Sequence, residues 1–570
     1  MLTKLTVRNF KRFEDVEIEL GNPVVFVGPN NSGKTTAMQA LALWDAGLKQ
    51  WLAKRSGRTA PEKRPGVTVN RRDLTAIPVP TANMLWRGLH THRGRRGEDG
   101  RTQTEIVRIA LIVEGVTGDA HWKCGLEFDY ANEESFYCRP LRTTGGGRMP
   151  VPPEAGKMQI AFLPPMSGLA ATETSLAAGA VNVRIGEGRT AEVLRNLCSR
   201  VLSDRPEEWK LLVSQIDHLF GVRLQQPRHV HERGEIEMAY KEGDVQLDLS
   251  ASGRGLQQTL LILAYLYANP GNVLLLDEPD AHLEILRQRQ IYGLLSETAD
   301  QSGSQVIAAS HSEVLLNEAA DKDLVIAFIG TPHVLGGRTS QLRKSLAEIG
   351  WDQYYQAEQK GWVLYLEGST DLTILRSFAR RLEHKAAAEA LQQPFVHYCG
   401  NRPSRAQNHF HGLAEAVPHL RGLALFDRLD SEPQTGAGLS IHTWRRREIE
   451  NYFCSLSALE SWARAPLPGD GPGGLFADSR TRAMCEAVEE VSAALSTLGK
   501  GSPWDEDTKV SDDFLTPLFE SYFRKLNLPN LMQKKNFHEL ADHVPEDEID
   551  PEIREKLDAI ARVAESAGPA

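Results

Sequence analysis

Long apolar runs are missing from this sequence of 570 residues. A helix that crosses a bilayer needs about 20 mainly apolar residues, and no stretch approaches that length. The first residues also lack the charged and then apolar layout of a signal peptide. We therefore expect no membrane contact and a cytoplasmic location. A transporter that works alone is excluded, whereas an ATPase that docks on separate membrane subunits is not.

Paired cysteines are missing as well. The six cysteines are scattered, and none forms a Cys-x-x-Cys pair. They are Cys124, Cys138, Cys198, Cys399, Cys454 and Cys485. Zinc sites and disulfide frameworks use cysteines at characteristic close spacings. The sequence therefore predicts reduced thiols, with neither a zinc site nor a disulfide framework.

Excess positive charge is the third absence, because the formal net charge is −10. Any binding of nucleic acid must then use local basic clusters. One cluster between Arg87 and Arg101 contains five arginines and two histidines, and Arg445 to Arg447 form another. The glycines of the first cluster favour a solvated loop, with a nucleic-acid contact as the alternative.

A phosphate-binding loop is the most informative feature that is present. Residues 28–35 read Gly-Pro-Asn-Asn-Ser-Gly-Lys-Thr and follow the apolar run Val24 to Val27. A strand, a glycine-rich loop and a helix point several backbone N–H groups at one anion. The pattern predicts a nucleotide site in which Lys34 contacts the β- and γ-phosphates and Thr35 ligates Mg²⁺. The expected nucleotide-binding residues of this loop are Gly28, Asn30, Asn31, Gly33, Lys34, Thr35 and Thr36.

A second apolar run, Val273 to Leu276, ends in the two carboxylates Asp277 and Glu278. The pattern is typical of a buried strand. We expect Asp277 to hold Mg²⁺ through water, since Mg²⁺ keeps several waters in proteins. Glu278 is expected to orient the attacking water.

Three more motifs lie in a characteristic order. Residues 250–258 open a helix-length apolar segment, residues 280–283 follow the two carboxylates, and the apolar run 305–310 ends in His311. Together with the phosphate loop, this order resembles that of ABC-type ATPases. The resemblance implies a signature motif that binds ATP, a D-loop at 280–283, and a switch histidine, His311, that senses the γ-phosphate. The implied signature residues are Ser252, Gly253 and Gly255.

The N-terminal stretch Leu5 to Phe13 resembles the opening strand of the SMC, RecF and OLD group of ATPases. In that group two heads face each other, and ATP is bound between the phosphate loop of one and the signature of the other. The resemblance implies a homodimer, or a higher oligomer, formed through the heads. The Q-loop glutamine of such ATPases is not identified here, because Gln159 is a poor candidate.

The motifs divide the chain into three regions. We expect an ATPase domain over residues 1–345, a second α/β domain over 346–460, and a helical region over 461–570. The stretch 46–245 is too long to connect the two halves of a minimal ATPase core, so we interpret it as an inserted arm or helical lobe. Within it, 103–115 and 120–130 alternate like strands, and 191–219 has helical spacing.

Carboxylates follow two strands of the second α/β pattern. Glu367 and Asp371 come after Trp362 to Leu366, and Asp427 and Asp430 come after Gly422 to Phe426. The carboxyl ends of parallel strands meet at one edge of a sheet. Because hard cations take oxygen ligands, the pattern predicts a divalent-metal site.

This layout resembles a TOPRIM domain, and residues 447–452 resemble the acidic segment that closes the site in OLD-type proteins. The resemblance implies that Glu448 and Glu450 add metal ligands, on one face of a strand, and that Arg445 to Arg447 hold the substrate. The second acidic motif of the family is Asp-x-Asp, but Leu429 stands at its second acidic position here. Either Asp430 reaches in from a turn, or Asp427 alone serves.

As a whole the sequence resembles OLD-family ATPase-nucleases, including the Gabija nuclease and the ATPase and TOPRIM pair of the PARIS system. The resemblance implies an α/β protein that uses ATP and Mg²⁺ or Mn²⁺ to cleave DNA in anti-phage defence, with tRNA or other RNA as the second choice of substrate. A phage-encoded trigger or an accessory defence protein would be a further partner. A RecF-like DNA-repair clamp whose TOPRIM domain does not cut is the alternative. A detached transporter ATPase is disfavoured by the fused second domain.

Overall fold

The computed structural model divides into two compact units, Met1–Thr339 and Ser340–Ala570. It describes residues 1–55, 66–74, 76–96, 102–143, 145–164, 166, 168–335, 349–429, 436–465 and 477–567. All six cysteines are free. No helix among the described residues has the length and apolar character needed to cross a bilayer.

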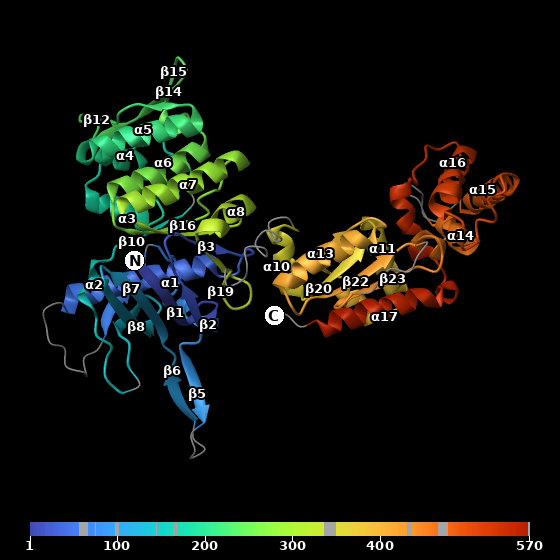
Figure 1. Cartoon of the computed structure of the whole chain (residues 1–570), viewed down its shortest axis with the longest axis horizontal. Coiled ribbons are helices and arrows are strands. Elements are labelled where there is room, and N and C mark those ends of the chain that lie inside the picture. The colour runs from blue at the N-terminus through green and yellow to red at the C-terminus, as the bar shows by residue number, and fades with distance from the viewer. Residues whose placement is uncertain are drawn as a thin grey trace. The chain divides into compact units, whose positions relative to one another are not determined.

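The N-terminal unit contains an antiparallel sheet, in which six strands are described (Figure 1). In sheet order they are β2 (Phe13–Glu19), β1 (Leu2–Phe10), β7 (Ile109–Thr117), β8 (Ala120–Asn132), β9 (Ser135–Pro140) and β4 (Val67–Asn70). Four of these strands come from the stretch interpreted above as an inserted arm. Because β7 pairs directly with β1, this part of the stretch belongs to the sheet and is not a separate arm.

Two other predictions within that stretch can be compared with the structure. One strand was expected over 103–115, but the structure has two, β6 (Thr102–Ile106) and β7. Strand β6 pairs with β5 (His92–Arg96), and this pair projects from the sheet (Figure 1). The expected helical segment is present as α4 (Leu194–Asp204) and α5 (Pro206–Phe220).

A second, mainly parallel sheet carries the nucleotide motifs. In sheet order its described strands are β10 (Ile160–Leu163), β16 (Val273–Asp277), β17 (Gln305–Ser310), β3 (Val24–Val27), β18 (Leu324–Ala327) and the antiparallel β19 (His333–Val334). Alternate residues of β16 enter different cores. Val273 and Leu275 pack with helix α1 (Lys34–Arg55) and the antiparallel sheet, whereas Leu274 and Leu276 pack with the helices of the other face. Burial on both faces explains why this strand is apolar throughout.

Helices cover the second face of the parallel sheet. The described ones are α3 (Ala178–Gly186), α4, α5, α6 (Arg254–Ala268), α7 (Ile285–Ser302) and α8 (Glu313–Lys322), and the short α2 (Pro153–Lys157) lies near α1. Small hairpins complete this lobe. Their strands are β11 (Arg223–Leu224), β12 (Arg228–Val230), β13 (Glu235–Glu237), β14 (Ala239–Glu242) and β15 (Val245–Asp248).

The C-terminal unit is built on a parallel sheet. Its described strands, in sheet order, are β21 (Val396–Tyr398), β20 (Trp362–Leu366), β22 (Arg421–Phe426) and β23 (Leu439–Thr443). The helices that alternate with them are α10 (Trp351–Lys360), α11 (Ser369–Arg381), α12 (Lys385–Ala390) and α13 (Pro403–Ala416). All the strand carboxyl ends therefore lie at one edge.

Helices from the end of the chain pack into the same core as this sheet. They are α14 (Leu456–Arg464), α15 (Ala477–Thr497), α16 (Thr516–Lys525) and α17 (Pro551–Ser566). Helix α17 lies against β20 and β22, so residues 100 or more positions downstream of the sheet cover it. The predicted α/β fold with a helical C-terminal region is confirmed.

Helix α1 carries a buried carboxylate. Asp45 is 7% exposed, and its Oδ2 accepts from Lys49 Nζ at 2.7 Å. Among the described residues its Oδ1 has no hydrogen-bond partner. Burial raises the pKa of Asp45 to about 6, although the ammonium of Lys49 opposes this.

The variant Asp45→Asn tests this environment. A carboxyl group whose pKa is raised in the folded state contributes stability below its unfolded pKa and loses that contribution as the pH rises through about 6. We expect the variant to be more stable than the parent at pH 8, by about 2 kcal/mol, with the difference closing towards pH 4. Thermal unfolding across this pH range measures it. The exposed Asp15→Asn is the control, and a difference that does not change with pH would contradict the expectation.

Candidate functional site

The phosphate-binding loop joins β3 to α1, and the ammonium group of Lys34 is hydrogen-bonded to the backbone of this loop. Gly28 and Gly33 have φ angles of 145° and 114°, which only glycine adopts readily. A Cβ on Gly28 would lie 2.8 Å from the carbonyl oxygen of Phe328. Lys34 Nζ donates to the carbonyl oxygens of Gly28 and Pro29 at 2.7 and 3.0 Å. Burial of this ammonium lowers the pKa of Lys34 to about 8.

The two predicted Mg²⁺ groups lie in contact. Thr35 Oγ1 donates to Asp277 Oδ2 at 3.0 Å, although the residues are 242 positions apart. Burial, and then the charge of Glu278, raise the pKa of Asp277. A hydroxyl group beside a carboxylate supplies the hard oxygen donors that Mg²⁺ takes.

Strand pairing brings the predicted catalytic pair together. Asp277 lies opposite Ala309 on the neighbouring strand β17, so the residues after each strand end are adjacent. His311 Nε2 lies 3.5 Å from Glu278 Oε1, and Glu278 has a positive φ of 50°. Burial and the nearby Lys34 lower the pKa of His311. The D-loop is held to the same place, because Ser310 Oγ donates to Asp280 Oδ1 at 2.8 Å.

The signature residues begin helix α6. Gly253 is the N-cap of this helix, and Ser252 Oγ donates to the carbonyl oxygen of Leu249 at 2.7 Å. A Cβ on Gly255 would lie 2.7 Å from the side chain of Leu283 and 3.0 Å from the carbonyl oxygen of His282. The signature therefore packs on the D-loop. In the described part of the chain, no hydrogen bond or ion pair joins it to the phosphate loop.

The remaining loop residues fit a bound nucleotide. Among the described residues, the buried Ser32 Oγ has no hydrogen-bond partner, so it is free for a phosphate. Asn30 and Asn31 are exposed, and Thr36 is half-buried in the first turn of α1. Gln159 lies before β10, at the end of the sheet opposite to Asp277, as its bond to Val273 N indicates. It therefore does not reach the nucleotide site.

In the C-terminal unit the predicted carboxylates lie at the carboxyl ends of β20 and β22. Glu367 follows β20, and Asp371 occupies the first turn of α11, where its Oδ2 accepts from the N–H groups of Glu367 and Gly368 at 3.0 and 3.2 Å. Asp427 follows β22, and its Oδ1 accepts from Ile449 N at 3.2 Å. Asp430 lies outside the described residues.

These carboxylates influence one another strongly. Burial raises the pKa of Asp427 to about 9, and the charges of four other carboxylates add to this effect. They are Glu367, Glu450, Asp371 and Glu448. Burial raises the pKa of Glu450 to about 8 and that of Asp371 to about 6. Five acidic side chains from three segments thus occupy one electrostatic environment.

The acidic segment does not have the predicted strand geometry. Ile449–Tyr452 is a 3-10 helix, in which Glu448 is the N-cap, so Glu448 and Glu450 do not alternate along a strand. Both oxygens of Glu448 are committed, because Oε1 accepts from Ser511 N at 2.5 Å and Oε2 accepts from Ser511 Oγ at 3.0 Å. Asn451 Oδ1 accepts from Glu448 N and favours this turn over a strand.

Among the described residues, no three His, Cys, Asp or Glu side chains are arranged to hold a metal ion. The donor chemistry nevertheless fits a divalent cation. Oxygen ligands are those that Mg²⁺ and Mn²⁺ take, and a cation would relieve the mutual repulsion of the carboxylates. Glu367, Asp371, Asp427 and Glu450 are the residues that would hold it.

Two of the arginines predicted to hold the substrate form ion pairs within the C-terminal unit. Arg445 Nη2 lies 2.7 Å from Glu555 Oε2, and Arg446 Nη2 lies 3.1 Å from Asp550 Oδ2. Both acids belong to helix α17 or its N-cap, so these pairs hold the helix to the sheet. Arg447 is exposed and forms no ion pair with the described residues. In the first basic cluster, Arg87 pairs with Glu14, and 97–101 lie outside the described residues.

The sequence analysis missed a lysine at the carboxylate site. Burial raises the pKa of Glu448, and the charge of Lys509 opposes this rise. The hydrogen bond with Asp512 raises the pKa of Lys509, and the charges of Glu448 and Glu367 add to this effect. Its Nζ lies 2.5 Å from Asp512 Oδ2. No motif surrounds Lys509 in the sequence, and its place depends on the packing of the C-terminal helices. The sequence marks Lys509 only as one basic residue in a region without a recognised motif.

Comparisons with known proteins agree with the N-terminal motifs. A family described as "AAA ATPase domain" matches residues 1–46, and one described as "AAA domain, putative AbiEii toxin, Type IV TA system" matches residues 199–317. A curated relative, the OLD nuclease of Thermus scotoductus, is 23% identical over 349 residues. The family matches agree with an ATPase in the N-terminal unit, and the chain is similar to a protein named OLD nuclease. The OLD match covers 55% of this chain and 59% of that protein, so less than two thirds of the relative is spanned.

Solved structures of SMC head domains also resemble part of the chain. The SMC head domain from Thermotoga maritima is 16% identical to this chain, with a TM-score of 0.32. The matched region spans 59% of this chain and 99% of the SMC head domain. The Smc head domain with an extended coiled coil, in a complex derived from Pyrococcus furiosus, is 15% identical, covers 61% of this chain and 99% of its own, and gives a TM-score of 0.34.

Replacing the loop lysine tests the nucleotide site. Lys34→Ala removes the ammonium that lies inside the loop, and we expect ATP affinity to fall by about 100-fold, the loss of a strong charge-assisted interaction. Titration with a fluorescent ATP analogue measures the affinity. Lys54→Ala, an exposed lysine at the other end of α1, is the matched control. Equal affinities for the two variants would contradict the assignment.

Proposed function

We propose that this chain is an ATP-regulated, metal-dependent endonuclease of the OLD type that acts in the cytoplasm in anti-phage defence. One observation carries the proposal: four carboxylates from two other segments surround Asp427, which follows β22 at the carboxyl edge of a parallel sheet. The similarity to a protein named OLD nuclease supports it. We assign this sheet to a TOPRIM domain.

In the N-terminal unit, each residue takes the role that its position favours. Lys34 holds the phosphates, and Thr35 and Asp277 hold Mg²⁺ beside them. Glu278, which lies against His311, orients the attacking water, and His311 contacts the γ-phosphate. Following the group that the sequence resembles, we propose a homodimer in which the signature of one head completes the ATP site of the other. ATP would then regulate the carboxylate site by changing how the heads meet.

In the C-terminal unit, the chain positions and charges the reacting groups. A bound Mg²⁺ or Mn²⁺ would supply an activated water and neutralise charge on the phosphate. Asp371 fixes the turn that presents Glu367, because it accepts from two N–H groups of that turn. Ile449 N orients Asp427, and Ser511 keeps Glu448 in place. Lys509 and the exposed Arg447 are the cations available to contact a phosphate.

The proposed substrate is DNA, with tRNA or other RNA as the second choice. A phage-encoded trigger or an accessory defence protein would be a further partner. A non-cleaving repair clamp of the RecF type is the second candidate function. The clamp is favoured by Leu429, which stands where the family has an acid. It is also favoured because, among the described side chains, no three His, Cys, Asp or Glu residues are arranged to hold a metal ion.

Cleavage assays with Glu367→Ala separate the two candidates. Plasmid DNA and total tRNA are incubated with the protein, with Mg²⁺ or Mn²⁺, with and without ATP. We expect the parent to cut one of these polymers and the variant to cut at least about 100-fold more slowly, which is about 2.7 kcal/mol in the barrier. ATP hydrolysis should stay within about twofold, because the N-terminal site is unchanged.

Glu389→Ala, a surface carboxylate on α12, is the control and should cut like the parent. A parent protein that cuts neither polymer, with or without ATP, would favour the clamp. Cleavage that persists in Glu367→Ala would show that another site is responsible.

Asp427→Asn tests the crowded carboxylates without any substrate. The substitution removes a half-buried acid from beside four others, so we expect the metal-free C-terminal unit to unfold a few degrees higher, about 1–2 kcal/mol more stable. The increase in melting temperature that Mn²⁺ gives the parent should be lost. Asp542→Asn, an exposed acid paired with Arg380, is the control for both measurements. A lower melting temperature with an intact response to Mn²⁺ would contradict the proposed site.

A further inference from the structure

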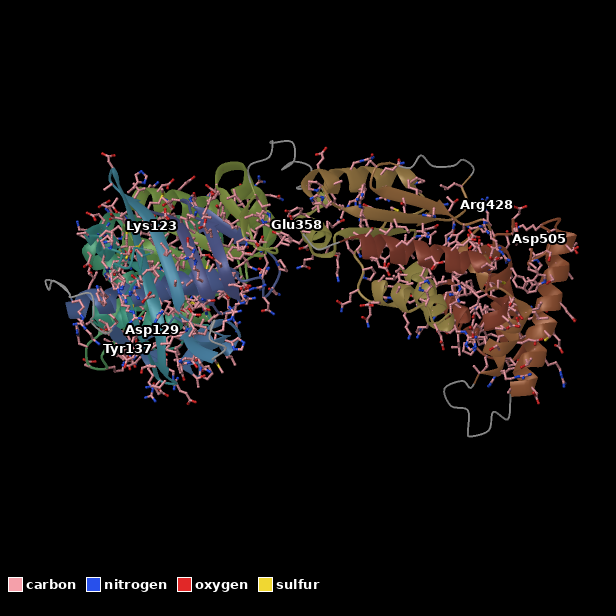
Figure 2. All side chains as sticks on the ribbon, turned by 90° about the horizontal axis from the view of Figure 1, so that it is seen from below. Lys123, Asp129, Tyr137, Glu358, Arg428 and Asp505 are labelled. Carbon is pink, nitrogen blue, oxygen red and sulfur yellow. The ribbon has the colours of Figure 1, made fainter. Side chains whose placement is uncertain are left out.

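The loop at residues 501–509 lies directly against the carboxylate segment. Arg447 N donates to the carbonyl oxygen of Glu506 at 2.8 Å, and Asn451 Nδ2 donates to that of Thr508 at 3.1 Å. Arg428, just after the strand that presents Asp427, pairs with Asp507. Figure 2 labels Arg428 and Asp505, which lie where the sheet meets the C-terminal helices. The loop is therefore part of the wall of this site.

Short hydrogen bonds hold the loop in one conformation. Ser502 N donates to Asp505 Oδ2, and Thr508 Oγ1 donates to the carbonyl oxygen of Ser502, both at 2.7 Å. Between these anchors, Trp504 is 41% exposed, and its ring contacts the buried Phe514 edge-on at 5.4 Å. A fixed and partly exposed indole keeps much of its surface free for a ligand.

A second exposed aromatic lies on the other side of the carboxylates. Tyr398 is the last residue of β21 and is 45% exposed. It pairs with Leu366, the residue before Glu367, and Gly400 N donates to the carbonyl oxygen of Glu367 at 3.2 Å. In sheet order, Tyr398 therefore precedes Glu367 and Asp427, and the Trp504 loop follows them.

The distribution of exposed aromatics in this unit is informative. Among its described side chains, the large exposed apolar ones include only two aromatics, Tyr398 and Trp504. The others are Leu456, Leu498, Leu528 and Leu531. Tyr398 lies on the strand beside Leu366, and Trp504 lies in the loop that bonds to Arg447 and Asn451. Most aromatic rings of the unit lie in its core, so two exposed rings beside one site suggest a ligand with flat faces.

Resting on the proposed nuclease function, we propose that the site acts on nucleic acid with unpaired bases, which stack on Trp504 and Tyr398 on either side of the phosphate that is cut. Every base has a π-face, and stacking on aromatic side chains is the usual means of holding single strands. In a duplex those faces are covered by neighbouring bases. The exposed Glu506 and Asp507 beside the indole disfavour a phosphate there, whereas Arg447 and Lys509 favour one nearer to the carboxylates.

Binding measurements with the full-length protein test the proposal. Fluorescence polarisation with Ca²⁺ in place of Mg²⁺ compares a labelled 20-nucleotide single strand, DNA or RNA, with the matching duplex. We expect the parent to bind single strands at least about tenfold tighter than duplex. Trp504→Ala and Tyr398→Ala should each weaken single-strand binding by about tenfold, in the range measured for loss of one stacked base, and leave duplex binding within twofold.

Trp504→Phe keeps an aromatic ring and should bind like the parent, which separates stacking from misfolding. Leu498→Ala, at the end of α15 and 71% exposed, is the matched surface control and should change nothing. Equal binding of single strand and duplex by the parent, or equal behaviour of Trp504→Ala and Leu498→Ala, would overturn the proposal. In the latter case the exposed rings would serve a protein partner instead.

The two proposals can fail separately. If Glu367→Ala loses cleavage while Trp504→Ala cuts single strands and duplexes like the parent, only the stacking inference is wrong. If the parent cuts neither polymer but still prefers single strands through Trp504, the nuclease function fails, and the site binds unpaired nucleic acid without cutting it.

Discussion

Repulsion among clustered carboxylates is the constraint on which the carboxylate site of the C-terminal unit depends. Asp427 has a pKa raised to about 9 because it is buried beside four other acids. The parallel sheet creates this crowding, since its strands all end at the same edge. The backbone N–H of Ile449 stabilises Asp427, and those of Glu367 and Gly368 stabilise Asp371, so part of the cost is offset locally. The rest is offset by the large apolar core beneath.

That core depends on the end of the chain. Helix α17 packs on β20 and β22, and Arg445 and Arg446 form ion pairs with acids of that helix and its N-cap. Ser511, from the segment before α16, holds both oxygens of Glu448. The C-terminal helices therefore belong to the same core as the sheet. They fix the acidic segment and bring Lys509 and Trp504 to the same site.

The geometry of the phosphate loop was largely predictable because its chemistry is local. A loop that turns N–H groups towards a phosphate favours glycine at Gly28 and Gly33, where φ is positive, and the pattern continues with a lysine and a hydroxyl residue, here Lys34 and Thr35. Asp277 and His311 were also found from sequence, because each follows an apolar run that can only be a buried strand. The positions of Glu367 and Asp427 at strand ends were predictable for the same reason, and their role as metal ligands stays a prediction.

Sequence alone therefore determined the α/β class, the phosphate loop and the acids that follow strands, since spacing along one strand or turn dictates where such groups point. Tertiary structure decided the rest. Glu448 and Glu450 lie on a 3-10 helix and not on a strand, two of the three clustered arginines hold a helix, and Lys509, Tyr398 and Trp504 meet the acids from distant positions. Local sequence patterns do not predict such contacts, because the contacts form when segments far apart in the chain pack together.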